Sequence, residues 1–254
     1  MDIAVCVKLT YDVQEIRADG NGAPVFQNVP IKISEFDKYA IEAGVKLKEG
    51  SGGVVRMFSV ANPNAKEAIK EALARGCDEG YIIAYDYPPQ DPAMVSKLLA
   101  SAIRIHAPQS QIIFAGEASS DMSSSVTGAM VAAWLGIPFI GYASKVQVQG
   151  DSVMIERDGD NVIEGFVCKP PVVIGTSDRL NKPRTPTLTQ ILSAGRKPVK
   201  ILSPDNVDPE AAPLSKMEKV DVFRMERKRV LIDGSDPVSS AEKLISELRR
   251  EGVL

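Results

Sequence analysis

The chain has 254 residues, of which 44% are hydrophobic and 25% are charged, and its formal net charge is −3. These values are ordinary for a soluble globular protein of one large or two smaller domains, and a chain of this length buries enough surface to fold without disulfide or metal staples. The slightly acidic balance argues against a general nucleic-acid binder, which needs clustered Lys and Arg.

The first element is a β-branched run over residues 3–7, which predicts a strand. No basic segment followed by a long apolar one precedes it, so a signal peptide is not expected. No run of about 18 apolar residues occurs, so we expect no direct membrane insertion. The cysteines Cys6, Cys77 and Cys168 are widely spaced and form no CxxC or zinc pattern. These features predict a cytoplasmic protein.

Short apolar runs alternate with helical patterns as far as residue 142. Strands that are almost continuously hydrophobic and separated by helices are typical of a parallel sheet covered on both faces. We therefore expect a three-layer, doubly wound, mainly parallel α/β fold. The expected strands are residues 3–7, 54–60, 81–85, 112–116 and 138–142, and the expected helices are 35–50, 64–76, 92–105 and a segment ending at Leu135.

The pattern changes after Tyr142. Alternating segments broken at Gly150-Asp151 and at residues 158–160 predict an antiparallel meander that extends the sheet. One more buried strand, residues 171–176, and a short helix over 187–197 capped by Thr187 are expected to follow.

The composition becomes charged and proline-bearing from about residue 201, so this part cannot easily form its own core. Its last segment, residues 239–254, has the pattern of an amphipathic helix with a serine cap. We therefore predict an α/β domain over residues 1–200 and an extended C-terminal arm over 201–254. Such an arm folds only against the body of the chain or against a partner subunit.

Residues with catalytic chemistry are scarce. The single histidine, His106, is expected to help terminate a helix, and Cys6 lies inside a predicted strand. No GxSxG, HExxH or GxxxxGK[ST] motif occurs. The carboxylates Asp158, Asp160 and Glu164 suit a solvated hairpin tip better than a calcium loop. The sequence therefore favours binding over bond-making chemistry.

A serine-rich turn follows the predicted strand 112–116 and precedes a helix. In an open α/β sheet, ligands bind beyond the carboxyl ends of the strands, and this edge carries LTYD (9–12), ANPN (61–64) and the serine turn. Helix N-termini there attract phosphate. The turn would either cap the helix or cradle a phosphate, and the number of hydroxyl groups favours the phosphate. The hydroxyl donors are Ser123, Ser124, Ser125 and Thr127.

Several collinear motifs give the chain a resemblance to the β subunit of electron transfer flavoprotein, including its Fix-type branch. They are IAVCVKLTYDVQEIRADGNG (3–22), KISEFDKYAIEAGVKLKEG (32–50), SVANPNAKEAIKEALARGCDEG (59–80), AAWLGIPFIGYASKV (132–146), IERDGDNVIEGFVCKPPVVIG (155–175) and RLNKPRTPTLTQILSAGRKPV (179–199).

The resemblance implies an adenine-nucleotide-binding fold of the flavodoxin or HUP-like kind. It implies an electron carrier subunit, not an enzyme, in a heterodimer with an α subunit that holds or shares the redox-active FAD. The β subunit itself would bind AMP or, in electron-bifurcating members, a second FAD. Electrons would arrive from acyl-CoA or related dehydrogenases, as in fatty acid oxidation, and leave to a quinone oxidoreductase or a ferredoxin.

The resemblance also implies residue roles. A recognition loop that docks partner dehydrogenases would fall on residues 186–197, with Leu188 as the anchor, unless Leu188 packs under its own helix. The implied docking residues are Arg184, Leu188, Ile191, Arg196 and Lys197. The implied nucleotide contacts are Cys6, Ser34, Ala61, Asn62, Asn64, Gly116, Asp121, Ser123, Ser124, Ser125, Val126 and Thr127.

One stretch departs from the family. The AMP-type turn usually reads Asn-Gln-Thr-Gly, where this chain has Ser125, Val126, Thr127 and Gly128, and the bifurcating type usually has a Gln that is also missing here. AMP and FAD therefore both remain open. A stand-alone nucleotide-binding α/β enzyme would normally carry an SGGxDS-type loop after its first strand, and a nucleotide sensor of related fold lacks the meander and the long arm.

Overall fold

The computed structural model describes residues 1–86, 88–220, 222 and 228–254. They form two compact units, Met1–Val220 and Asp221–Leu254. The larger unit contains the central sheet. Its strands are β1 (Ile3–Cys6), β6 (Val55–Ala61), β7 (Glu79–Ala84), β8 (Ile112–Gly116), β9 (Phe139–Gln149), β10 (Ser152–Asp158), β11 (Ile163–Cys168), β12 (Val172–Thr176) and β13 (Val199–Leu202).

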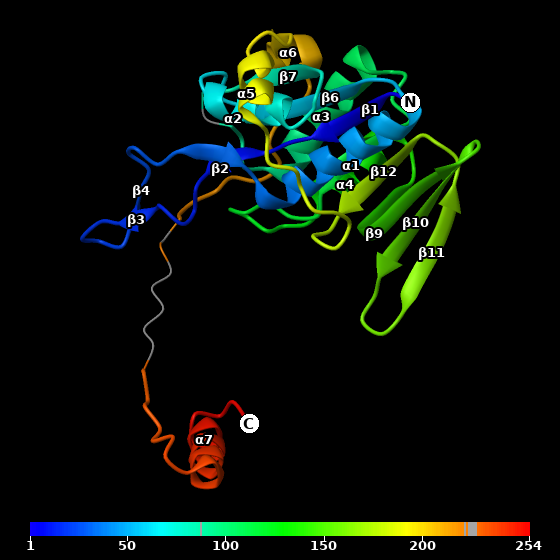
Figure 1. Ribbon diagram of the computed structural model, residues 1–254. Coiled ribbons are helices and arrows are strands. Elements are labelled where there is room, and N and C mark those ends of the chain that lie inside the picture. The colour runs from blue at the N-terminus through cyan, green and yellow to red at the C-terminus, as the bar shows by residue number, and fades with distance from the viewer. Residues whose placement is uncertain (87, 221, 223–227) are drawn as a thin grey trace. The chain divides into compact units, whose positions relative to one another are not determined.

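The nine strands lie in the order β11-β10-β9-β12-β8-β1-β6-β7-β13 (Figure 1). The neighbouring strands in the part β9-β12-β8-β1-β6-β7-β13 are all parallel. Strand β10 pairs antiparallel with both β9 and β11. The predicted parallel sheet and its antiparallel extension are both confirmed. The turn after β9 contains Gly150 at φ 60°, a left-handed conformation that favours glycine.

Helices cover both faces of the sheet and confirm the three-layer fold. One face carries α1 (Glu35–Ser51), α2 (Lys66–Ala74) and α5 (Leu188–Ala194). The other face carries α3 (Pro92–His106), α4 (Thr127–Leu135) and α6 (Pro204–Val207).

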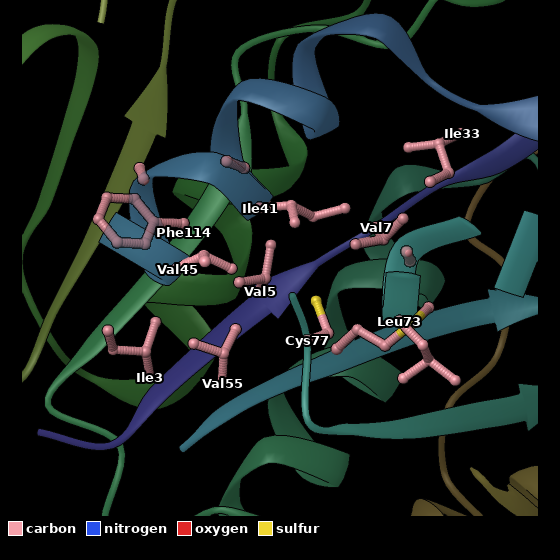
Figure 2. Packing of buried hydrophobic residues seen from close by; sticks show 14 of the residues in the cluster. Ile3, Val5, Val7, Ile33, Ile41, Val45, Val55, Leu73, Cys77 and Phe114 are labelled. Carbon is pink, nitrogen blue, oxygen red and sulfur yellow. The ribbon is translucent and has the colours of Figure 1, made fainter. Parts of the chain in front are cut away.

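The first strand shows why its sequence is hydrophobic throughout. Ile3, Val5 and Val7 point toward α1 and pack with the cluster that includes Ile41 (Figure 2). The alternate residues Ala4 and Cys6 belong to the cluster on the other face. Because successive side chains point to opposite faces, a strand buried on both sides needs apolar residues at every position.

The direction of winding reverses at β1. The chain passes from β1 through α1 to β6 on one side, whereas β8 pairs with the other side of β1 after α3. The connections leave the carboxyl ends of β1 and β8 in opposite directions, and such a point in an α/β sheet is where ligands bind. We call it the switch-point crevice.

Two small antiparallel sheets were not predicted. They pair β2 (Leu9–Tyr11) with β5 (Ile31–Ile33), and β3 (Arg17–Ala18) with β4 (Pro24–Val25). Strands of two or three residues are too short for an alternating pattern to be recognisable.

The C-terminal region differs from the predicted division at residue 200. The strand β13 adds to the edge of the sheet beside β7, and Val207 of α6 is buried, so both belong to the larger unit. The smaller unit contains α7 (Pro237–Arg250). A serine cap was expected for this helix, and the prediction was wrong: Asp236 is the N-cap and accepts a hydrogen bond from the Ser239 N–H.

Candidate functional site

A cavity of about 260 Å³ opens at the carboxyl ends of β1, β6 and β8. Residues 6–11, at and after the end of β1, line it, and so do Asn62 and Ala65 after β6. The third segment begins at the end of β8 and contributes residues 115–119, 121–122 and 124–127. These are the three segments that the sequence placed at this edge. Helix α3 adds Pro92, Val95 and Leu99, and the other described residues of the lining are Ile31, Asp37, Val60, Asp86, Pro88, Pro89 and Gln90.

Most of the predicted nucleotide contacts reach this cavity. The lining includes Cys6, Asn62, Gly116, Asp121, Ser124, Ser125, Val126 and Thr127. The other four lie outside the lining. Ala61 is buried in β6, Asn64 donates its backbone N–H to the Asn62 side chain, Ser34 accepts a hydrogen bond from the Ser120 N–H, and Ser123 donates to the Ser119 carbonyl.

The hydroxyl groups of the serine turn, residues 117–126, do not cap the helix that follows. Val126, the last residue of the turn, is the N-cap of α4, and its apolar side chain makes no capping hydrogen bond. Within the described part of the chain, the first N–H groups of α4 have no side-chain acceptor, and the helix begins in the cavity lining. An uncapped helix N-terminus with hydroxyl groups around it is suited to an anion such as a phosphate.

Part of the turn is held by α1 instead. The Ser120 hydroxyl accepts a hydrogen bond from the Glu35 N–H at 3.0 Å, at the first turn of α1. Two residues of the turn, Ser123 and Ser125, have φ of 49° and 54°. Non-glycine residues rarely adopt this left-handed conformation, and it tends to occur where surrounding structure enforces it at a functional site.

The cavity is acidic in its side chains. Among the described residues that line it, Lys8 is the one lysine or arginine, against the carboxylates of Asp37, Asp86, Glu117 and Asp121. The Lys8 ammonium is 2.7 Å from the Asp121 carboxylate. Burial raises the pKa of Asp121, but the hydrogen bond and the charge of Lys8, together with hydrogen bonds from Ser119 and Thr10, lower the pKa overall. A phosphate would therefore rely on backbone N–H groups and hydroxyls, and would compete with Asp121 for Lys8.

Asp37 joins the two strands that border the crevice. Its buried carboxylate accepts the Lys8 N–H at 2.7 Å and the Gly116 N–H at 3.0 Å. Burial raises the pKa of Asp37 to about 7, and these two N–H groups act in the opposite direction. Sequence analysis missed this residue, because a carboxylate in the first turn of a helix is expected there for its favourable interaction with the helix dipole alone.

The described residues near the cavity supply no activated nucleophile. Burial, followed by the charge of Asp37, raises the pKa of Cys6 to about 12, so its thiol stays protonated. His106 ends α3 as predicted and stacks on Tyr81 with ring centroids 5.1 Å apart. Asp158 and Glu164 of the meander are paired with Arg179 and Arg157, as suits a solvated hairpin.

The predicted docking segment forms α5, and Thr187 caps it in a capping box with Gln190, as the sequence indicated. The Leu188 side chain is 73% exposed, so it does not pack under its own helix. Leu192, which sequence analysis did not single out, is 67% exposed, and Ile191 is also exposed. Together Leu188, Ile191 and Leu192 form an exposed apolar surface, which we call the α5 surface.

The cations around α5 have different roles. Arg184 bonds inward to Glu42 and Glu49 of α1, and the Lys197 ammonium donates to the carbonyls of Leu73 and Cys77. Arg196 is exposed. Of the three predicted cations, Arg184 and Lys197 are thus occupied within the chain.

No helix in the described ranges is long and apolar enough to cross a membrane. The described part of the chain also holds no group of three or more His, Cys, Asp or Glu side chains arranged for a metal ion.

Comparison with known proteins agrees with the geometry. Residues 25–207 match the family described as "Electron transfer flavoprotein domain". The chain is 32% identical to an electron transfer flavoprotein subunit beta of Clostridium acetobutylicum, over 99% of both chains. It is 34% identical to the subunit of that name from Thermoanaerobacterium thermosaccharolyticum, over 82% of this chain and 80% of that one, and 29% identical to that of Bacillus subtilis, over 99% and 98%. The chain therefore belongs to the electron transfer flavoprotein family.

Proposed function

We propose that this chain is the β subunit of a heterodimeric electron transfer flavoprotein. In this role it binds AMP for structure in the cavity and docks dehydrogenases at the α5 surface. Electrons then pass through FAD, held by or shared with the α subunit, to a quinone oxidoreductase. The observation that carries the proposal is the uncapped N-terminus of α4 in a cavity at the switch-point crevice.

The residues of the cavity fit an adenylate in three ways. The N–H groups that begin α4 and the hydroxyls of Ser124, Ser125 and Thr127 would hold the phosphate. The Lys8 ammonium would add a charge-assisted hydrogen bond. The carboxylates of the lining are acceptors that suit ribose hydroxyls, and the chain needs no group for hydrolysis in this role.

A second FAD in place of AMP is the alternative for the same cavity, and it would make the protein electron-bifurcating with ferredoxin as an acceptor. The observation that favours it is the pair of motifs KISEFD (32–37) and SSDM (119–122), which resemble the Fix-type branch, although Ser125 and Val126 supply the side-chain amide of neither type. Asparagine, which the AMP-type turn usually has at this position, adopts the left-handed φ of Ser125 more readily than serine does. The backbone conformation therefore does not explain why this chain has a serine here.

Two surfaces support an α-subunit partner. Helix α7 has no buried residue, although Val238, Leu244 and Ile245 recur at helical spacing along it. On the antiparallel extension, Met154, Ile163 and Val167 are exposed, and Met154 lies opposite Val167. Apolar surface of this extent is typical of protein interfaces.

The proposal is tested by co-expressing the chain with the α subunit encoded by the same organism. We expect a yellow complex that elutes as a heterodimer in size-exclusion chromatography and whose flavin is reduced by an acyl-CoA dehydrogenase and its substrate. A chain that elutes alone, or a complex whose flavin no dehydrogenase reduces, would overturn the proposal.

A further inference from the structure

The carboxylate of Asp37 lies between the two loops that border the switch-point crevice. One oxygen accepts the Lys8 N–H, just after β1, at 2.7 Å, and the other accepts the Gly116 N–H, at the end of β8, at 3.0 Å. Asp37 is 6% exposed. Both N–H groups belong to residues that line the cavity.

The contact between Asp37 and Gly116 leaves no room for adjustment. A Cβ atom at Gly116 would lie 2.3 Å from the Asp37 carboxylate and 2.8 Å from the backbone carbon of Phe36. Glycine is therefore required for β8 to approach the start of α1 this closely. Thr176 of β12 supports the same corner, since its hydroxyl is 3.3 Å from the carbonyls of Phe36 and Ala115.

The two loops that Asp37 joins carry the phosphate-binding groups of the proposed site. Lys8 is the cation of the lining, and the serine turn begins directly after Gly116. A displacement of either loop would move the ammonium or the N-terminus of α4 relative to the other. Misplacement of a binding group by about 1 Å is enough to lose much of its contribution.

We propose that Asp37, in its ionised form, is a positioning residue that ties the two loops together and sets the arrangement of Lys8 and the serine turn for a nucleotide phosphate. This inference rests on the proposed nucleotide-binding function. The proposal predicts a change in anion affinity opposite to the change that the charge of Asp37 alone would cause. Removing a buried negative charge near an anion site should strengthen anion binding, whereas losing the tie should weaken it.

The charged and titratable groups that face Asp37 are Cys6, Lys8 and Asp121. The raised pKa of the Cys6 thiol and the lowered pKa of the Asp121 carboxyl place both outside the neutral range. The pKa of Asp37 itself, raised by burial to about 7, means that the tie weakens as the pH falls below neutrality.

The experiment is a calorimetric titration of AMP into the full-length chain after its nucleotide has been removed. The Asp37→Asn variant keeps the shape of the side chain, but its amide NH₂ cannot accept a hydrogen bond. We expect AMP to bind this variant at least about tenfold more weakly than the wild type, which corresponds to the loss of one hydrogen bond to a charged group. The matched control is Glu35→Gln, which removes a carboxylate of the same helical turn that pairs with Lys38 and is not among the described lining residues. It should change the affinity less than about twofold.

The outcomes separate the two proposals. If the wild type binds neither AMP nor FAD, the proposed function fails. If the wild type binds AMP and Asp37→Asn binds it equally or more tightly, the positioning role is wrong.

If the Asp37→Asn variant does not fold, a measurement on the wild type tests the positioning role of Asp37. The backbone amide resonances of Lys8 and Gly116 should shift together as the pH changes, with one midpoint near pH 7, because both N–H groups lose an ionised acceptor when Asp37 is protonated. The Val7 amide, which donates to the Phe58 carbonyl within the sheet, should not follow this midpoint and serves as the control. Amides of Lys8 and Gly116 that do not titrate, or that titrate with different midpoints, would contradict the tie.

Discussion

Arg184 and Glu42 form an ion pair that anchors the segment leading into α5 to helix α1. The Arg184 Nε atom lies 2.8 Å from the Glu42 carboxylate, and a second guanidinium nitrogen lies 3.1 Å from its other oxygen. Glu42 is 3% exposed, and Glu49 accepts two further bonds from the same guanidinium. Arg75 adds a hydrogen bond to the Arg184 carbonyl, so the base of the α5 surface is fixed to two helices.

Replacement of Arg184 by methionine should destabilise the chain by about 3 kcal/mol, because it leaves the buried Glu42 carboxylate without its main partner. Lys46, 3.7 Å away, is the remaining cation near Glu42. Urea denaturation of Arg184→Met and of the double variant Glu42→Gln/Arg184→Met measures this. The double variant should recover part of the loss. A single-variant cost below about 0.5 kcal/mol, typical of surface substitutions, would show that the pair contributes little.

Leu188→Ala should impair reduction of the heterodimer by its dehydrogenase. An exposed leucine that fills a pocket of a partner contributes enough that truncation should raise KM at least about tenfold. Flavin content and AMP affinity should not change, since α5 is not part of the cavity lining. Thr189→Ala, an exposed position on the same helix, is the control. Equal KM values for the two variants would show that Leu188 does not contribute to docking.

The stability of the chain should depend on pH through Asp37. Its pKa is about 7 in the folded chain against an ordinary value of 3.8, so the folded state binds more protons than the unfolded state between these values. The stability due to this group is therefore fully present below pH 3.8 and is lost as the pH rises through about 7.

Across this window the free energy of unfolding of the wild type should fall relative to that of Asp37→Asn, by up to about 1.4 kcal/mol per pH unit. Urea denaturation of both proteins from pH 4.5 to 7.5 measures the difference. A constant difference at every pH would contradict a raised pKa. Together with the positioning role, this means that the ionised form costs stability and serves binding, as is common at functional sites.

Removal of the residues after Val220 should abolish the heterodimer and preserve nucleotide binding. The larger unit, which holds every described residue of the cavity lining and of both core clusters, ends at Val220. Removal of everything after residue 200 should instead unfold the edge of the sheet, since it takes away part of β13 and all of α6. Size-exclusion chromatography with the α subunit and AMP titration test both truncations. A chain truncated at Val220 that still forms the heterodimer would exclude the arm as its main interface.

The central strands and their order of connection follow from the sequence, because a buried parallel strand such as residues 3–7 must be apolar at every position. The location of the cavity also follows, since the carboxyl ends of β1, β6 and β8 share one edge. The role of Asp37 does not, because a contact between α1 and the end of β8 joins residues 79 positions apart. The inward orientation of Arg184 depends likewise on a partner that lies 142 positions away.

The edge strand β13 was missed for a related reason. Its residues, Val199–Leu202, form a short run beside prolines and charges, and three of the four are exposed. Nothing local distinguishes such a run from the start of an irregular arm. Its parallel pairing with β7 defines it as a strand.

The measurement that tests the account most directly is a count of the nucleotides released when the purified heterodimer is denatured. The account predicts one FAD and one AMP per heterodimer, with two FAD per heterodimer as the outcome for a bifurcating protein. A complex that releases one FAD and no second nucleotide would contradict the assignment of the cavity beside α4 as a nucleotide site.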